Sequence, residues 1–263
     1  MAVAGVLPVL LGGDANVYGM ARSFYEAYGV HSVAVCKKTL PALAHSRLVQ
    51  AAVQNPRLEE DEVFTAALQA LAGAYPDKTC LLVSCADGYT MQLARCRKEL
   101  APLYRFACQP PEVVQSLGTK EGFAAVCAAN GLRTPQSVTL ACGAPLPDLP
   151  FGWPVIVKPA DSPAYWNCRF PGKRKVYLVQ DRTELEQTVA TVVQGGYTGA
   201  LLLQEYIPGP DTALGVVNAY CARDGSVSWM VQGQVLLQER TPEGVGNYGA
   251  ILTEPARQDT ALL

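Results

Sequence analysis

The first third of the chain alternates short apolar runs with segments whose apolar residues recur at helical spacing. Val6–Leu11 is an apolar run that predicts a buried strand, and the apolar residues from Val17 to Tyr28 recur every three or four positions, as on one face of a helix. Gly29 is placed to end that helix. The same two patterns predict further strands and helices at 32–35, 63–71, 80–84 and 88–100. Strands and helices in alternation indicate an α/β domain built on a parallel sheet.

The pattern changes near Gln109-Pro110-Pro111, which predicts a boundary between a first domain over 1–110 and a second over 111–263. Thr119 is expected to cap the first helix of the second domain, and Thr183–Glu186 reads as the capping box of a later helix. Short strands are predicted at 137–140, 155–157, 175–179, 200–203, 216–222, 227–231 and 235–238. The tight turns between the last of these strands favour antiparallel pairing, so the second half is predicted to be α+β.

Composition and charge mainly exclude classes of protein and of partner. Hydrophobic residues make up 49% of the 263 residues and charged residues 17%, which suits a packed core and excludes a disordered chain. The net charge of -2 gives no electrostatic reason to expect nucleic acid or an acidic membrane as a partner. No apolar stretch reaches the ~20 residues of a membrane span, and no secretory signal pattern opens the chain. We therefore expect a cytoplasmic protein, whose oligomeric state the sequence leaves open.

Cysteine and histidine usage argues against metal, disulfide and thiol chemistry. Nine cysteines are scattered along the chain without a Cys-x-x-Cys pair, and two histidines, His31 and His45, are present. This pattern is typical of small, half-buried cysteines in a reducing compartment, rather than of a zinc site or a disulfide framework. A cysteine nucleophile is disfavoured, because two histidines offer little choice of base.

Gly12-Gly13-Asp14 lies between a predicted strand and a predicted helix, a position that binds an anion or a polar substrate in many α/β proteins. The alternative is a tight turn with a helix-capping aspartate. The segment lacks the G-x-G-x-x-G spacing, so a nicotinamide-dependent oxidoreductase is disfavoured. Asp14, Arg22 and Asp87 are assigned to strand ends of the first domain, where such sheets bind substrates.

Basic residues in three places are candidates for phosphate binding. Lys158 ends the apolar strand of Val155–Lys158-Pro159, where a buried charge is costly unless it meets an anion. Lys120 lies in the first turn of a helix, where the helix dipole disfavours a cation unless a negative group is near. The stretch 163–175 ends in Gly172-Lys173-Arg174-Lys175 and reads as a flap over phosphates. For each of them, an ordinary solvated lysine or loop stays the alternative.

The segment Leu201–Asp211 carries the sharpest signal. An apolar strand ends in Gln204-Glu205, continues as an extended Tyr206-Ile207, and turns at Pro208-Gly209. An adenine needs one backbone donor and one backbone acceptor on an extended segment, with an acidic residue beyond for the ribose hydroxyls. The alternative is a plain strand followed by a turn.

Together these motifs resemble the ATP-grasp superfamily. The order matches: a lysine at a helix start, a lysine in V-x-V-K-P, a basic flap, and the Q-E-Y-I-P-G hinge. The resemblance implies a pre-ATP-grasp, Rossmann-like α/β domain followed by an α+β ATP-grasp domain. It also implies that the nucleotide site consists of Lys120 and Lys158 for the phosphates, Ser162 and Lys175 at the flap, Gln204, Glu205, Tyr206 and Ile207 for adenine, and Asp211 for ribose.

Within the superfamily the chain is most similar to bacterial carboxylate–amine ligases of the D-aspartate ligase type. This likeness rests on Leu11–Tyr18, Ala21–Ser23 and 234–251, notably Gly246-Asn247-Tyr248. It implies that ATP and Mg²⁺ convert a carboxylate to an acyl phosphate, which an amine then attacks to form an amide. D-aspartate is one carboxylate that the likeness suggests. Arg240 is the candidate for holding the acyl phosphate, and the substrate candidates are Gly13, Asp14, Arg22, Asp87 and Asn247.

One departure from the family pattern concerns magnesium. The family carries its acidic and asparagine metal ligands late in the chain, after the strand that corresponds to Ile251, and here only Thr253–Leu263 remains, with Glu254 and Asp259. We therefore expect an ATP-grasp domain that is incomplete at its C-terminus, with metal ligands beyond residue 263 and no ATP turnover by this chain. The alternative function is a non-catalytic module that binds a nucleotide or metabolite.

Overall fold

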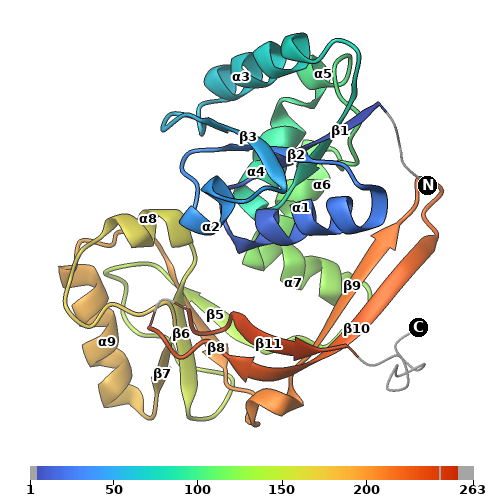
Figure 1. The fold of residues 1–263 in the computed structure, drawn as a ribbon. Coiled ribbons are helices and arrows are strands. Elements are labelled where there is room, and N and C mark those ends of the chain that lie inside the picture. The colour runs from blue at the N-terminus through green and yellow to red at the C-terminus, as the bar shows by residue number, and fades with distance from the viewer. Residues whose placement is uncertain (1–4, 243, 254–263) are drawn as a thin grey trace. The chain divides into compact units, whose positions relative to one another are not determined.

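The computed structural model describes residues 5–242 and 244–253, and the chain divides into two compact units, Met1–Leu132 and Arg133–Leu263 (Figure 1). The first unit contains β1 (Val6–Leu11), α1 (Ala15–Tyr28), β2 (Ser32–Cys36), α2 (Pro41–Ala44), β3 (Val49–Gln54), α3 (Asp61–Ala74), β4 (Thr79–Ser84), α4 (Asp87–Arg95), α5 (Arg97–Leu100), α6 (Pro111–Gly118) and α7 (Lys120–Ala129). The second contains β5 (Ser137–Leu140), β6 (Val155–Pro159), α8 (Ser162–Asn167), β7 (Tyr177–Val179), α9 (Arg182–Gln194), β8 (Leu201–Glu205), the 3₁₀ turn η1 (Asp211–Ala213), β9 (Gly215–Cys221), β10 (Val227–Gln238) and β11 (Tyr248–Leu252). None of the helices within these described stretches is long and apolar enough to cross a membrane.

The first unit is built on a four-stranded parallel sheet in the order β3-β2-β1-β4, as the alternating pattern predicts. Successive side chains of β1 enter opposite cores: Val9 and Leu11 join the core that contains Phe64 of α3, and Leu10 joins the core that contains Val17 of α1. Both faces of the sheet are therefore covered, which explains why β1 is an unbroken apolar run.

Helix boundaries in the first unit follow from their capping residues. The Asp14 carboxylate accepts a hydrogen bond from the backbone N–H of Asn16 at 3.0 Å, which starts α1, and Gly29 ends the helix in the left-handed conformation with φ 68°. Thr119 caps α7 by accepting from the backbone N–H of Gly122 at 3.0 Å. The predicted end of α1 at Gly29 and the predicted cap of α7 at Thr119 are confirmed.

The first unit differs from the sequence-based expectation in several features. Strand β3 was not expected, because its small and polar residues alternate between half-buried and exposed positions and give a weak apolar signal. Helix α6 was not expected either, because it begins with Pro111, a residue that suits the first helical turn as well as it suits a linker. The segment 88–100 is helical as expected except at Cys96, which separates α4 from α5.

The second unit contains two antiparallel sheets, β5-β8-β6-β7 and β11-β10-β9, so the predicted antiparallel pairing is confirmed. Its core lies on the first of these sheets, where the buried rings of Tyr165 and Tyr197 meet edge to face at 5.4 Å between centroids. Two local expectations are corrected. The strands predicted at 227–231 and 235–238 are one strand, β10, because pairing with β9 continues through Gly233.

The second correction concerns the start of α9. The capping box is formed by Asp181 and Glu184, two residues earlier than the predicted Thr183–Glu186. The Asp181 carboxylate accepts from the Glu184 backbone N–H at 2.9 Å, and the Glu184 carboxylate accepts from the Gln180 N–H at 2.7 Å. An aspartate two positions upstream therefore takes the capping role that the threonine motif suggested.

The compact units divide at residue 132, whereas the sequence suggested a domain boundary at 110. The difference arises because α6 packs against α4 of the first unit and α7 packs against α6. The functional assignment of residues 111–132 to an ATP-grasp domain stays a prediction.

Two glycines near the start of α1 allow a matched stability test. A Cβ atom at Gly13 would overlap the carbonyl oxygen of Lys38, whereas a Cβ at Gly19 of α1 would meet open space. Gly13→Ala is therefore expected to lower the free energy of unfolding by about 2 kcal/mol or more, and Gly19→Ala to leave it unchanged or raise it by up to about 1 kcal/mol. Urea denaturation of the two variants measures this, and equal stabilities would contradict the tight approach of Gly13 to Lys38.

Candidate nucleotide-binding site

The second unit contains a cleft of about 510 Å³ at the ends of β8 and β6, within the size range of small-molecule sites. Several predicted nucleotide residues line it, namely Lys158, Gln204, Glu205, Tyr206 and Ile207. Its wall also includes residues to which the sequence assigned no site role: Pro135, Ile156, Val176, Pro208, Gly209, Pro210, Ala213, Leu214, Gln238, Gly246 and Tyr248. The structure therefore brings the V-K-P lysine and the hinge into one wall.

Antiparallel pairing of β6 with β8 explains why Lys158 meets Gln204. In this register Ile156 lies opposite Gln204 and Lys158 lies opposite Leu202, so Lys158 and Gln204 are diagonal neighbours on the two strands. The Lys158 ammonium donates to the Gln204 side-chain carbonyl at 2.8 Å. The two residues are far apart in the sequence, and the sheet register alone places them together.

Lys158 is half-buried, and burial lowers the pKa of its ammonium from the usual value. Among the described residues its hydrogen-bond partner is the neutral amide of Gln204 rather than a carboxylate. A half-buried cation with a neutral partner leaves positive charge at the cleft, which suits an anionic ligand such as phosphate.

The hinge segment after β8 is fixed at one end and open at the other. Glu205 is tied to Gln136: its backbone N–H donates to the Gln136 carbonyl at 2.9 Å, and its carboxylate accepts from the Gln136 N–H at 3.0 Å. Ile207 lies beyond this anchor with its side chain 62% exposed. Glu205 therefore holds the hinge to the sheet, while Tyr206 and Ile207 line the cleft.

The predicted flap over 163–175 is an ordered segment packed around Tyr165. The Tyr165 hydroxyl donates to the Arg174 carbonyl at 2.7 Å, and Lys173 donates to the carbonyl of Cys168 at 2.6 Å while lying 4.7 Å from the centre of the Trp166 ring. Lys173 is thus directed into its own loop. Ser162, an exposed residue, opens the short helix α8 at the start of the segment.

Lys175 and Asn247, assigned from the sequence to the flap and to the substrate, are in contact. The Lys175 ammonium donates to the Asn247 side-chain carbonyl at 2.8 Å, and the Lys175 backbone N–H donates to the Pro242 carbonyl at 2.9 Å. The flap end is therefore joined to the loop between β10 and β11, which also carries Arg240 at its start.

The Asp211 carboxylate accepts several hydrogen bonds from the protein itself, which the sequence does not suggest. Its carboxylate accepts from the backbone N–H and side-chain amide of Gln238, both at 3.0 Å, and from Arg240 at 3.1 Å. These hydrogen bonds, those of Gln238 first, hold the pKa of Asp211 below its usual value. Arg240, the candidate for the acyl phosphate, is 78% exposed and pairs with this carboxylate.

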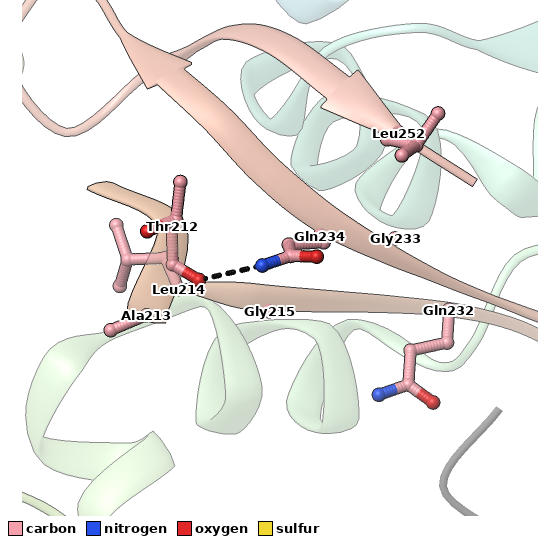
Figure 2. Close-up of a pocket in the computed structure, with 8 residues that line it drawn as sticks. All are labelled: Thr212, Ala213, Leu214, Gly215, Gln232, Gly233, Gln234 and Leu252. Atoms are coloured by element: carbon pink, nitrogen blue, oxygen red, sulfur yellow. Dashed lines mark hydrogen bonds between the residues drawn. The ribbon is translucent and has the colours of Figure 1, made fainter. Parts of the chain in front are cut away.

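A smaller hollow of about 220 Å³ lies beside η1, between the start of β9 and the middle of β10 (Figure 2). The Gln234 side-chain amide reaches across it and donates to the Thr212 carbonyl at 2.9 Å. This hydrogen bond is a second tie between β10 and the turn that follows the hinge.

In the first unit, Gly13 and Asp14 follow β1, and Asp87 opens α4 after β4, so all three lie at the carboxyl edge of the parallel sheet. This edge has a topological switch point, since the chain leaves β1 toward β2 and β4 pairs with the opposite side of β1. Burial, with a smaller contribution from Asp14, raises the pKa of the nearby Cys85 thiol to about 11, so this cysteine is protonated at neutral pH.

Of two further predicted residues of the first unit, Arg22 takes another position and Lys120 lies at a helix start as expected. Arg22 was assigned to a strand end, but it lies two turns into α1 and pairs with Glu26 at 2.6 Å, with both side chains about 60% exposed. Lys120 opens α7, and its assignment to the nucleotide stays a prediction.

Metal binding has no support in the described part of the chain. Within residues 5–242 and 244–253, no group of three or more His, Cys, Asp or Glu side chains is arranged to hold a metal ion. Glu243, Glu254 and Asp259, the acidic residues near the end of the chain, lie outside the described residues.

Comparison with known proteins identifies structures of similar fold and a relative of similar sequence. No family model matches the chain. Its structure is similar to an L-amino acid ligase from Bacillus licheniformis, with a TM-score of 0.64, 16% identity and coverage of 95% of this chain and 54% of that one. It is also similar to D-alanine–D-alanine ligase from Bacillus anthracis, with a TM-score of 0.51, 14% identity and coverage of 95% and 70%. The chain therefore shares its fold with these two ligases.

A more specific likeness is found in the sequence. The chain is 34% identical over 256 residues to D-aspartate ligase from Enterococcus faecium (strain Aus0004), a match that covers 94% of this chain and 61% of the ligase. The chain thus spans less than two thirds of the length of this relative. The resemblance that the sequence motifs predicted is confirmed.

The half-buried charge of Lys158 gives a stability prediction with a defined sign. Because burial lowers its pKa, the folded chain releases this proton at a lower pH than the unfolded chain does. Wild type should therefore gain stability relative to Lys158→Met as pH rises through the lowered pKa toward the ordinary value of ~10.4. Urea denaturation of both proteins between pH 7 and pH 10.5 measures the difference.

At pH 7 Lys158→Met is expected to be at least as stable as wild type, since it removes a partly desolvated charge and keeps the apolar stem. A loss of more than about 2 kcal/mol would instead show that the lysine is needed for folding.

Proposed function

We propose that the second unit binds ATP in the cleft beside the hinge and that the protein is an ATP-dependent carboxylate–amine ligase. The observation that carries this proposal is the pairing of a half-buried Lys158 with Gln204 in the same wall as the extended hinge. The hinge offers backbone groups to adenine, and the lysine offers charge to phosphate. The likeness to D-aspartate ligase supports the reaction class, and the similar D-alanine–D-alanine ligase was solved in complex with ATP.

In the proposed reaction, a substrate carboxylate attacks the terminal phosphorus of ATP, and ADP leaves. The resulting acyl phosphate is attacked by an amine, which forms an amide and releases phosphate. The chain contributes position and positive charge: Lys120 and Lys158 hold the nucleotide phosphates, and Ser162 and Lys175 border the reacting phosphate. Arg240 stabilises the negative charge of the acyl phosphate.

The carboxylate and amine are small molecules in this proposal, and D-aspartate is the carboxylate that the similar ligase suggests. Their contacts are assigned to Gly13, Asp14, Arg22 and Asp87 of the first unit and to Asn247 of the second. We also propose that the protein acts in the cytoplasm, with functional domains over 1–110 and 111–263.

Magnesium belongs to the proposal through the reaction class, since phosphoryl transfer from ATP depends on a divalent cation that neutralises phosphate charge. A structurally similar biotin carboxylase domain from Hydrogenobacter thermophilus holds magnesium with ADP. The described residues of this chain contain no cluster that fits the ion, so none of the steps above is assigned to it.

Removal of the Lys158 charge is expected to weaken ATP binding at least ~10-fold, since a charge-assisted contact contributes ~1.5–3 kcal/mol. Isothermal titration calorimetry of Lys158→Met with ATP measures this. Lys98→Met is the matched control, because Lys98 is an exposed lysine of α5 outside the cleft, and its ATP affinity should equal that of wild type. Equal affinity of Lys158→Met and wild type would place the nucleotide elsewhere.

A non-catalytic module that binds a nucleotide or metabolite is the alternative, and turnover distinguishes the two. The natural protein is assayed for ADP formation with Mg²⁺, ATP and pairs of amino acids or peptides. The ligase proposal predicts ADP formation that requires both a carboxylate and an amine, with D-aspartate more active than L-aspartate. ATP binding without ADP formation for every pair would favour the module.

A further inference from the structure

The segment between β6 and β7 contains a closed ring of hydrogen bonds around the backbone of Arg174. The Arg174 N–H donates to the Tyr177 hydroxyl at 3.1 Å, and the Arg174 carbonyl accepts from the Tyr165 hydroxyl at 2.7 Å. The two hydroxyl oxygens lie 2.8 Å apart. Because the single proton of the Tyr165 hydroxyl is given to Arg174, the Tyr177 hydroxyl donates to the Tyr165 oxygen. All three hydrogen bonds therefore run in one direction around the ring.

Both tyrosines of this ring are fixed by the rest of the second unit. Tyr165 is fully buried, and its ring meets those of Phe170 and Tyr197 edge to face. Burial raises the pKa of Tyr165, so its hydroxyl keeps the proton that the ring of hydrogen bonds requires. Tyr177 begins β7 and lies opposite Val157 of β6. The two hydroxyls are therefore held in place by the core on one side and by the sheet on the other.

The peptide unit between Arg174 and Lys175 is held at both of its polar groups. Its carbonyl accepts from Tyr165, and its N–H, which is that of Lys175, donates to the Pro242 carbonyl at 2.9 Å. A peptide unit is planar, so hydrogen bonds to both groups fix the orientation of the plane. They thereby fix the point and direction from which the Lys175 side chain leaves the backbone.

Lys175 lies at the edge of the cleft and keeps its charge for a ligand. Val176, the next residue, lines the cleft. Gly246 and Tyr248, which flank the partner residue Asn247, line it as well. The Lys175 ammonium donates one hydrogen bond to the neutral Asn247 side chain at 2.8 Å. An ammonium has three donors, so two remain for an anion.

We propose that Tyr165 and Tyr177 are positioning residues for the phosphate end of the site. Through the backbone of Arg174, their hydroxyls hold Lys175 where its ammonium meets the terminal phosphate of ATP. Neither tyrosine touches the nucleotide, and both act through Lys175. This inference rests on the proposed ATP site, in which Lys175 borders the reacting phosphate.

The first test compares ATP with ADP, which lacks the terminal phosphate, by titration calorimetry. Tyr177→Phe removes one hydroxyl and keeps the aromatic ring. We expect it to weaken ATP about 3- to 10-fold and to leave ADP within about twofold of wild type. Tyr220→Phe is the matched control, because Tyr220 is a tyrosine of β9 that is 54% exposed, and both affinities should equal those of wild type. Unchanged ATP affinity, or an equal loss for ADP, would overturn the proposal.

The second test asks whether the tyrosines act through Lys175. ATP affinity is measured for Tyr177→Phe, for Lys175→Met and for the double variant. We expect Tyr177→Phe to add no further loss to Lys175→Met, because the hydroxyl has nothing left to position. Additive losses would overturn the positioning role. Tyr165→Phe should show the same selective loss of ATP affinity, and if this buried change prevents folding, Tyr177→Phe decides alone.

A ligand-free measurement separates this proposal from the ATP site itself. In nitrogen-15 NMR spectra without nucleotide, Tyr177→Phe is expected to shift the side-chain amide signals of Asn247, which Lys175 contacts from across the unit. Tyr220→Phe should leave these signals unchanged. If the wild type binds neither nucleotide, the ATP site fails, while this result still decides whether the hydroxyls position Lys175. Unshifted Asn247 signals in Tyr177→Phe would overturn the positioning role.

Discussion

The half-buried ammonium of Lys158 is the constraint on which the candidate site depends. A lysine at the end of an apolar strand loses part of its hydration. In this structure its ammonium donates one hydrogen bond to the neutral side chain of Gln204 in place of water. The sheet keeps this arrangement because the alternating side chains of β6 and β8 fill the core that contains Tyr165. Apolar packing thus fixes the backbone register, and the register sets a cation beside the hinge.

Local sequence signals predicted the parts of this site that lie next to one another in the chain. Lys158 was found because a charge ends an apolar run, and the hinge was found because polar residues interrupt a strand before Pro208. The caps of α1 and α7 were found for the same reason, since each depends on residues within one turn. These features need no knowledge of distant parts of the chain.

Long-range pairing explains what the sequence did not reveal. No sequence motif around Gln238 indicates its contact with Asp211, because the two residues are far apart in the chain. Strand β10 was divided in two because Gly233 resembles a break, yet its partner β9 pairs straight through it. Arg22 was assigned to a strand end of the first domain, while the observed contact with Glu26 is set by one helical turn of α1.

The hydrogen bonds between Asp211 and Gln238 also restrict the segment that connects the two sheets of the second unit. The two sheets of the second unit are connected after β8 by a short segment, and Asp211 anchors the far end of it to β10. Residues 206–210 are the part of this segment that lies between the anchored residues Glu205 and Asp211. Two of these residues, Pro208 and Pro210, have a restricted φ. Gly209, with φ 155°, is the one glycine in this span. The covalent connection between the two sheets is therefore a short segment of restricted conformation, and the contacts of Lys175 with Asn247 and Pro242 join the sheets at a second place.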